Sequence, residues 1–441
     1  MQYLNNQARA LPAALQMWGT VAASDGATVT IRGLSGLARL GDQVEIAPGP
    51  GQSITAEVVA LGEEDVRGLL MGSGTGIGAG MTARLTADPG PRPGVGWLGQ
   101  VVDGAGLRAN GTPPPLGPAP GLALRAVPPR SDRRRPLGPR LQTGLVAFDT
   151  LLPICRGQRL GIFAGSGVGK SSLLTRLAEG VAADVVVIGL IGERGREVGD
   201  FIRRLRESGA LSRTVVVAAT SDQSALMKRR AALLTMTVAE HFRDKGQHVL
   251  CLLDSVTRFA EAHREIALAA GEPPALRAYP PSTGGEIAAL CERAGPGSVD
   301  DKGGDITGIF TVLVAGSDTE EPVSDMLRGT LDGHVVLDRA IAERGRYPAI
   351  DLRRSVSRSA ELAWNPEEAA LCARARRLIA TYEEAAPMIQ AGLYTPGGDT
   401  ALDEAVAFYP ALDALAGAPS PGDGSVAESY AALERAMERA G

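Results

Sequence analysis

LGIFAGSGVGKS, at Leu160–Ser171, is the stretch of sequence that determines the fold class of this chain. Its first four residues are apolar and run directly into a glycine-rich turn, which is typical of a buried strand that ends in a loop. Ala164–Ser171 matches the phosphate-loop pattern G-x-x-x-x-G-K-[ST], except that Ala164 stands where the pattern has glycine. We expect a helix to begin near Lys170, so that strand, turn and helix follow in the order that the pattern requires.

This turn predicts a site for the phosphates of a nucleotide. Glycine lets backbone N–H groups curl around phosphate oxygens, and the positive N-terminus of the following helix points at them. The ammonium of Lys170 can reach the terminal phosphates, and the hydroxyl of Ser171 can bind magnesium. The residues expected to bind the nucleotide here are Gly165, Ser166, Gly167, Val168, Gly169, Lys170, Ser171 and Ser172.

On both sides of this turn, short apolar runs rich in β-branched residues alternate with helical patterns. The runs lie at Leu160–Phe163, Val185–Ile191, Thr214–Ala218, Val249–Leu253 and Ile309–Val314. Short buried strands separated by helices are typical of a parallel sheet that is covered by helices on both faces. The sequence therefore predicts an α/β fold for its central part.

Two of the expected strands end in a carboxylate. HVLCLLD, at His248–Asp254, ends in Asp254, which we expect at the carboxyl edge of the sheet, where open parallel sheets bind ligands. Asp254 is thus a candidate second partner for magnesium, and the alternative is that it caps the next helix. The run Val185–Ile191 leads into GERGRE at Gly192–Glu197. Glu193 can orient the attacking water beside the γ-phosphate, unless these residues are only a solvated charge cluster.

The region before the nucleotide-binding part predicts a small all-β domain. Alternating polar and apolar residues at Thr28–Leu34, Gly41–Ile46 and Ile54–Val59 predict short antiparallel strands, either in a barrel or in a sandwich. Residues 1–17 precede them as a short amphipathic arm or a frayed terminus. This arm lacks a strongly basic face, which argues against direct binding to acidic lipids.

A connector and a helical region complete the chain. Proline and glycine are dense from Pro89 to Pro139, which predicts an extended crossover. Its basic run at Arg130–Arg135 is either a solvated loop or an anion-binding patch. After about Asn365 the pattern becomes helical, most clearly at Pro366–Ala385. We expect an arm at 1–18, a barrel domain at 19–87, a nucleotide-binding domain at 88–365 that begins with the crossover 88–140, and a helical domain at 366–441.

Composition excludes several classes of protein. The 441 residues predict about three domains, and 44% hydrophobic with 22% charged residues is an ordinary globular mixture. A net charge of −5 disfavours a general nucleic-acid binder. The four cysteines and four histidines are scattered without ligand spacing, so neither zinc nor a disulfide framework is expected. Without a signal-peptide pattern or an apolar stretch of about 18 residues, we expect a cytoplasmic protein.

These motifs resemble those of the catalytic subunits of rotary ATPases. Beyond the phosphate loop, the resemblance rests on Gly192–Glu197, on LDS at Leu253–Ser255 and on PAIDLRRSVS at Pro348–Ser357, which is similar to a ten-residue signature of that superfamily. Within it, REIALAAGEPP at Arg264–Pro274 and YPPS at Tyr279–Ser282 resemble the flagellar and type III secretion export ATPases. The resemblance covers nearly the whole chain.

The family implies a fold and roles for the residues already singled out. It implies a RecA-like parallel-sheet P-loop core between an N-terminal β-barrel and a C-terminal helical domain. It also implies that Lys170 and Ser171 bind phosphate and magnesium, that Glu193 is the catalytic base, and that Asp254 is the second magnesium carboxylate.

Three further residues receive roles from the resemblance alone. Tyr347 matches an aromatic that packs on adenine, and an ordinary interface tyrosine is the alternative. Arg358 matches an arginine finger that reaches the γ-phosphate of a neighbouring subunit, and a salt-bridging arginine is the alternative. Tyr394 is a weaker candidate for closing the adenine pocket. The stretch TGGEIA at Thr283–Ala288 departs from the family, which has a pore-facing loop there.

The function implied is that of a ring motor that hydrolyses Mg-ATP to release and unfold proteins for flagellar export. Its partners would be copies of itself in a hexamer, export-gate and stalk proteins, an ATPase regulator, and export substrates with their chaperones, at the cytoplasmic face of the inner membrane at the flagellar base. An injectisome ATPase remains the alternative. Glu193 disfavours a non-catalytic ATP synthase subunit, and a barrel segment with few aromatics disfavours an RNA translocase.

Overall fold

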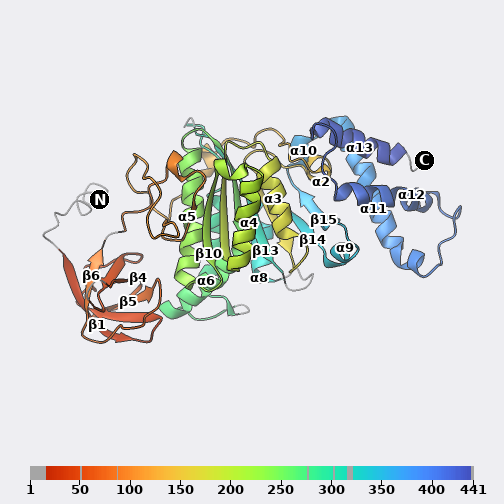
Figure 1. The fold of residues 1–441 in the computed structure, drawn as a ribbon. Coiled ribbons are helices and arrows are strands. Elements are labelled where there is room, and N and C mark those ends of the chain that lie inside the picture. The colour runs from red at the N-terminus through yellow and green to blue at the C-terminus, as the bar shows by residue number, and fades with distance from the viewer. Residues whose placement is uncertain are drawn as a thin grey trace.

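The computed structural model describes residues 16–49, 52–86, 88–275, 278–300, 303–314 and 321–438. Figure 1 shows three parts in the order of the sequence: a small barrel, a central sheet flanked by helices, and a group of helices at the C-terminus. Among the described residues, no helix is both long and apolar enough to span a membrane. Residues 1–15 of the expected N-terminal arm lie outside the described residues.

The N-terminal part is a closed antiparallel barrel, with strands in the order β1-β2-β5-β4-β3-β6. Its strands are β1 (Met17–Ser24), β2 (Thr28–Arg32), β3 (Gln43–Ile46), β4 (Ile54–Leu61), β5 (Asp65–Leu70) and β6 (Thr82–Thr86). Alternate residues such as Val29 and Ile31 are completely buried, as the polar–apolar alternation predicts. The barrel is therefore confirmed over the sandwich. Met17, in the segment assigned to the arm, already pairs with Leu85 of β6.

The central sheet has the strand order β15-β14-β8-β13-β11-β9-β10-β7, and β12 pairs with β13 beside this path. Its strands are β7 (Val101–Val102), β8 (Arg159–Ala164), β9 (Val185–Glu193), β10 (Thr214–Thr220), β11 (His248–Asp254), β12 (Gly295–Pro296), β13 (Asp305–Leu313), β14 (Gly333–Leu337) and β15 (Ile350–Ser357). The strands from β7 to β14 along the order are parallel, whereas β15 at the edge is antiparallel. All five strands predicted from apolar runs are confirmed.

Helices cover both faces of this sheet. The helices up to the end of the sheet are α2 (Val146–Asp149), α3 (Lys170–Gly180), α4 (Gly195–Glu207), α5 (Ala225–Arg243), α6 (Val256–Ala270), α7 (Ser282–Glu292), α8 (Pro322–Thr330), α9 (Arg339–Glu343) and α10 (Ala360–Ala363). Successive residues of β9 alternate between two cores, because Ile188 packs with α3 and α4 while Val187 packs with α5, α6 and α7. The predicted α/β architecture is confirmed.

The C-terminal part is helical, as predicted. Its helices are α11 (Pro366–Gln390), α12 (Thr400–Ala416) and α13 (Val426–Glu438). Helix α11 begins with a capping box: the N–H of Glu368 donates to the side chain of Asn365, and the N–H of Asn365 donates to the carboxylate of Glu368. Pro366 follows at the first helical position, where its missing N–H costs nothing. The helical region therefore starts where its sequence signal is strongest.

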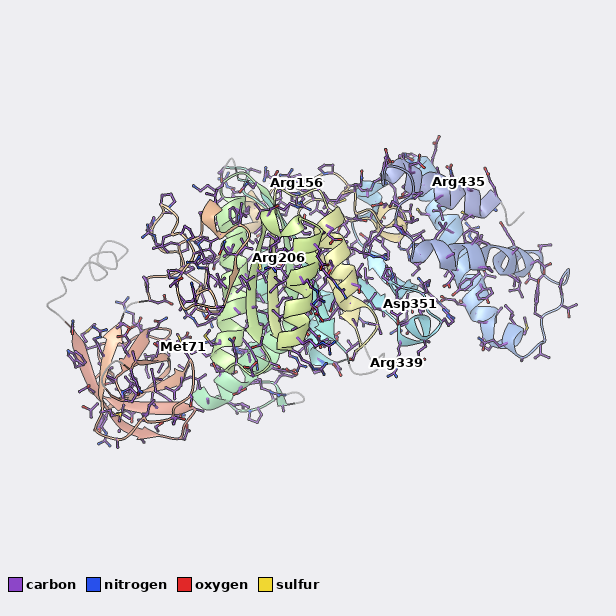
Figure 2. All side chains as sticks on the ribbon, viewed as in Figure 1. Met71, Arg156, Arg206, Arg339, Asp351 and Arg435 are labelled. Carbon is purple, nitrogen blue, oxygen red and sulfur yellow. The ribbon has the colours of Figure 1, made fainter. Side chains whose placement is uncertain are left out.

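Buried charges join the barrel to the central part. Glu57 of β4 accepts hydrogen bonds from Arg229 (2.6 Å) and Arg230 (3.1 Å) of α5. Arg230 also pairs with Asp88 at 2.8 Å, directly after the barrel. Met71, labelled in Figure 2 beside the barrel, accepts through its carbonyl from the Ser224 hydroxyl at the start of α5.

The crossover and its basic run take part in the central fold. Strand β7 lies within the crossover and pairs with β10. In the basic run, Arg133 pairs with Asp300, Arg134 with Glu292 and Arg135 with Asp305. These side chains are bound to protein carboxylates, which leaves the anion-binding patch without support.

The stretch Thr283–Ala288, where the family that the sequence resembles has a pore-facing loop, forms the first part of α7. Gly284 and Gly285 each disfavour a helix by about 1 kcal/mol relative to alanine. Tertiary packing outweighs this cost, because Ile287 and Thr283 are buried. All four cysteines are buried and free.

Candidate active site

The phosphate-loop segment joins the end of β8 to the start of α3, as its sequence predicts. Gly167 and Gly169 have φ angles of +80° and +89°, in the left-handed region that glycine adopts at little cost. A Cβ atom at position 169 would lie 2.9 Å from Cδ1 of Tyr347. The tyrosine ring therefore lies directly against the loop, and only glycine leaves room for it.

Three charged side chains converge beside this loop. Nζ of Lys170 lies 2.9 Å from Oε1 of Glu193 and also forms an ion pair with Asp254. Glu193 and Asp254 are the last residues of β9 and β11, which are neighbouring parallel strands, so both carboxylates lie at the same edge of the sheet. The hydroxyl of Thr311 donates to Asp254 at 2.6 Å. The structure thus brings together the lysine predicted from the phosphate loop and the two carboxylates predicted from the strand ends.

Burial and charge shift the pKa values of this group. Burial alone would lower the pKa of Lys170, but the carboxylates of Asp254 and Glu193 outweigh it, so the pKa is raised. For Asp254, burial and the charge of Glu193 raise the pKa of the carboxyl, against the opposing effect of Lys170. One ammonium therefore holds two carboxylates in a site that disfavours an unpaired negative charge.

A cavity of ≈ 980 Å³ opens beside the phosphate loop. Its walls include residues of the loop, Glu193, and three residues to which sequence analysis gave no role in the site: Arg258, Tyr279 and Glu321. The side chain of Arg258 packs against Gly192, where an added Cβ would lie 2.7 Å from its Cγ. A cation one helical turn after the strand-end aspartate was the signal that could have found Arg258.

The cavity suits a nucleotide that brings its own metal ligands. Among the described residues, no group of three or more His, Cys, Asp or Glu could hold a metal ion. Magnesium is ordinarily held by one or two protein oxygens together with phosphate oxygens and water. The hydroxyl of Ser171 and the carboxylate of Asp254 are donors of this kind, so the residues present fit a magnesium ion that arrives with a nucleotide.

The three residues that only the resemblance assigned lie in different places. Tyr347 contacts Gly169 of the loop. Arg358 follows β15, and its guanidinium reaches the carbonyls of Leu331 and Arg328 at 3.4 Å each. Tyr394 lies in the connection between α11 and α12 and donates a hydrogen bond to Asp403 at 2.6 Å. None of the three is among the described residues that line the cavity.

The register of β15 places Arg358 far from the phosphate loop of its own chain. Leu337 of β14 pairs with both Ala164 and Ile350, at the edge of the sheet where the loop begins. Gly333, at the opposite end of β14, pairs with Ser357. Ile350–Ser357 spans about 23 Å at ~3.3 Å per residue, so Arg358 lies at the amino edge of the sheet.

Comparison with known proteins gives this site its family. Residues 144–357 match the nucleotide-binding domain of the ATP synthase alpha/beta family, and residues 364–434 match the C-terminal domain of the type III secretion ATPase EscN. The chain is 43% identical to the flagellum-specific ATP synthase of Caulobacter vibrioides over 96% of each protein. The chain belongs to the family of flagellar and type III secretion ATPases.

Other members of the family agree with this assignment. A type 3 secretion system ATPase from Xanthomonas euvesicatoria is 43% identical over 70% of this chain and 69% of its own length. The structure of the assembled ATPase EscN from enteropathogenic E. coli covers 95% of this chain and all of EscN, with a TM-score of 0.86 at 37% identity. EscN bound to its central stalk EscO gives a TM-score of 0.84 at the same identity and coverage. This member of the export ATPase family is an enzyme that hydrolyses ATP.

Proposed function

We propose that this export ATPase is the ring motor of a flagellar protein export apparatus. The observation that carries the proposal is the convergence of Lys170, Glu193 and Asp254 beside the phosphate loop, in a chain related over nearly its full length to flagellum-specific enzymes. Hydrolysis would drive the release and unfolding of proteins for export. The chain would work in the cytoplasm, at the inner membrane below the flagellar base.

The phosphate loop and its neighbours would bind Mg-ATP. Backbone N–H groups from Gly165 to Ser172 would contact the phosphates, and Lys170 would exchange its carboxylate partners for phosphate oxygens. Ser171 and Asp254 would hold the magnesium ion, which neutralises phosphate charge when it is bound. The ring of Tyr347 would stack on adenine, because it already lies against the loop and is half exposed. Tyr394 would be the weakest of the proposed contacts, because its described hydrogen bond goes to Asp403 of α12 and not to the phosphate loop.

Glu193 would orient the attacking water. It lies at the end of β9 and lines the cavity. Once Lys170 turns to the phosphates, the carboxylate of Glu193 loses its partner and can accept a hydrogen bond from water, which is the task of a general base. The decisive experiment is Glu193→Gln: the variant should bind ATP normally and fail to hydrolyse it, and hydrolysis at the native rate would place the base elsewhere.

Arg358 would complete the site of a neighbouring subunit. Its place at the amino edge of the sheet supports this role, because in its own chain it is about 23 Å of strand away from the loop. An arginine supplied by another subunit makes hydrolysis depend on assembly. We therefore propose a homo-hexamer, which the assembled state of EscN supports. A stalk protein in the centre of the ring is the corresponding proposal from EscN bound to EscO.

An injectisome is the second candidate setting, because EscN and the Xanthomonas enzyme serve type III secretion systems. The two settings differ in which system fails when the gene is deleted. We expect deletion to abolish swimming and the secretion of flagellar proteins, and the wild-type chain, but not the Glu193→Gln variant, to restore both. Intact motility with loss of another secreted set of proteins would assign the chain to an injectisome. Export-gate proteins, a regulator and chaperones would be its partners in either setting, with no nucleic acid.

A further inference from the structure

A buried arginine stands next to Tyr347. Arg346 lies in the connection between α9 and β15, and its side chain is only 10% exposed. Its Nε lies 2.9 Å from Oδ1 of Asp413 in α12, and its Nη2 donates to the carbonyl of Ile350 at 2.9 Å. Burial lowers the pKa of Arg346, and the charge of Asp413 opposes this shift. The C-terminal helices are therefore held by charge to the residue that precedes Tyr347.

The end of α12 also packs on the main chain of these two residues. A Cβ atom at Gly417 would lie 3.0 Å from the carbonyl oxygen of Tyr347 and 3.2 Å from Cγ of Arg346. The carbonyl of Gly417 in turn accepts a hydrogen bond from Arg176 of α3 at 3.5 Å. The end of α12 therefore contacts both the segment that carries Tyr347 and α3, the helix that follows the phosphate loop.

These contacts form a short, continuous path. It leads from Asp413 to Arg346, through the peptide bond to Tyr347, and from the tyrosine ring to Gly169 of the phosphate loop. Figure 2 shows Asp351, at the start of β15, between the sheet and the C-terminal helices, which is the region that this path crosses. The residues that would act on phosphate and water, Lys170 and Glu193, have no contact with Arg346 among their hydrogen bonds and ion pairs in the described part of the chain.

We propose that Arg346 is a positioning residue for the nucleotide base: its ion pair with Asp413 holds Tyr347 against the phosphate loop and makes the binding of adenine depend on the position of α12. The inference rests on the proposed stacking of Tyr347 on adenine. It assigns a nucleotide-linked role to an ion pair between two parts of the chain.

The geometry explains why this ion pair can respond to movement. Nε and Nη1 of Arg346 have no hydrogen-bond partner among the described residues, so the contact with Asp413 is an attraction between charges without an aligned hydrogen bond. The pair is nevertheless largely shielded from water, because the Asp413 side chain is 28% exposed. Attraction between shielded charges falls with distance without a sharp angular limit. A shift of α12 therefore changes the hold on Tyr347 gradually.

The test separates the base from the phosphates. Asp413→Asn removes one charge at nearly constant volume, and Arg346→Gln removes the other with a shorter side chain. Both should raise the KM for ATP about fivefold while kcat stays within about a factor of two. Inorganic tripolyphosphate carries phosphates but no base, so its inhibition constant should not change. The double variant should be no worse than either single variant, because both remove the same interaction. Arg346→Lys keeps the charge and should retain part of the affinity.

Arg353→Gln is the matched control. Arg353 lies on β15, shortly after Arg346, and pairs with Glu384 of α11 at 3.2 Å. Among the described residues its ion pairs go to α11 and not to Tyr347. This variant should leave both KM and kcat unchanged. Should Arg346→Gln fail to fold, Asp413→Asn alone decides, because it leaves the arginine in place.

The possible outcomes separate the role of Arg346 from that of Tyr347. An unchanged KM in Asp413→Asn overturns the proposal, and so does an equal rise in the tripolyphosphate inhibition constant. Tyr347→Ala, measured beside them, tests the stacking itself. If it raises KM and Asp413→Asn does not, only the role of Arg346 is wrong. If Tyr347→Ala leaves KM unchanged, the stacking role fails and Arg346 loses its route to the base.

Discussion

The two edges of the central sheet carry the same kinds of charge but hold them differently. At the carboxyl edge one lysine, Lys170, lies between two carboxylates and beside an open cavity. At the amino edge, where Figure 2 labels Arg156, two arginines share one carboxylate, that of Asp305. Negative charge is in excess in the first of these two clusters, and positive charge in the second.

The difference shows how one sheet can carry exchangeable ion pairs beside its cavity at one edge and structural ion pairs at the other. The ammonium of Lys170 is a compact charge that can change partners, whereas a guanidinium binds a carboxylate through a fixed planar fork. Arg159 contacts both oxygens of Asp332 at 3.1 Å. Burial alone would lower the pKa of Arg159, but hydrogen bonds to Asp332 and Glu292 outweigh it, so the pKa is raised. The amino edge is built to stay in place, and the carboxyl edge is built for exchange.

The largest expected effect tests whether the amino edge is only structural. Arg358→Ala should lower the rate of ATP hydrolysis by about 10³–10⁵ if Arg358 acts on a neighbouring subunit. The measurement is the steady-state rate under conditions in which rings form. Lys170→Ala should be inactive for a different reason, the loss of its phosphate contact, so a mixture of the two variants should recover part of the activity. A near-native rate for Arg358→Ala alone would mean that Arg358 has only a structural role, like the other arginines of the amino edge.

The second effect concerns the carboxyl edge. Glu193→Gln should lower kcat by about 10²–10⁴, because it removes the group that orients water. Binding of ATP, measured by titration calorimetry, should remain because Lys170 and the loop are intact. A loss of binding equal to the loss of rate would mean that the carboxylate serves the site by holding Lys170.

The third effect belongs to stability. Asp305→Asn leaves Arg135 and Arg156 without their shared carboxylate and should lower the free energy of unfolding by about 2 kcal/mol. The loss should be below that of a fully buried pair, since both arginine side chains are about one-third exposed (35% and 34%). Urea unfolding measures it, and kcat of the folded protein should stay within about twofold. A drop in kcat without a drop in stability would mean that Asp305 serves hydrolysis, so the amino edge would not be purely structural.

The smallest effect compares the two ends of β11. Burial, with the charge of Arg156, lowers the pKa of His248 at the amino end, whereas burial raises that of Asp254 at the carboxyl end. A lowered histidine pKa means that the folded state binds fewer protons, so its contribution is present above pH ~6.5 and is lost as the pH falls. His248→Gln should therefore reduce the difference between the urea midpoints at pH 7.5 and pH 5.5. An unchanged difference would assign the pH dependence to other groups.

The sequence predicted the charged residues at the carboxyl edge of the sheet, because the end of a strand can be recognised from a few neighbouring residues. The apolar run before Asp254 ends where β11 ends, and β9 ends at Glu193. A parallel sheet then places these ends beside one another, since its strands share a direction. The phosphate loop needed only its glycines and its lysine. Each of these features occupies fewer than ten consecutive residues.

Features that depend on distant packing were not predictable in this way. Arg346 and Asp413 are 67 positions apart, and neither belongs to a motif. The helix at Thr283–Ala288 contains two glycines that locally oppose it, and only buried neighbours make it stable. The place of Tyr394 beside Asp403 likewise depends on how α12 follows its connection. Local sequence motifs identify the residues that would act in hydrolysis, whereas the residues that position them depend on tertiary packing.

Strand β15 joins two different sites under the proposed assembly, and this limits how its gene can change. Tyr347 precedes the strand and lies against the phosphate loop of its own subunit, while Arg358 follows it and would serve the next subunit. Individual side chains between them can be exchanged as long as the strand still pairs with β14. A codon gained or lost there would shift Arg358 by about 3.3 Å and turn it to the other face of the sheet. Variation among descendants of this gene should therefore accumulate here as substitutions, with the number of residues between Tyr347 and Arg358 kept constant.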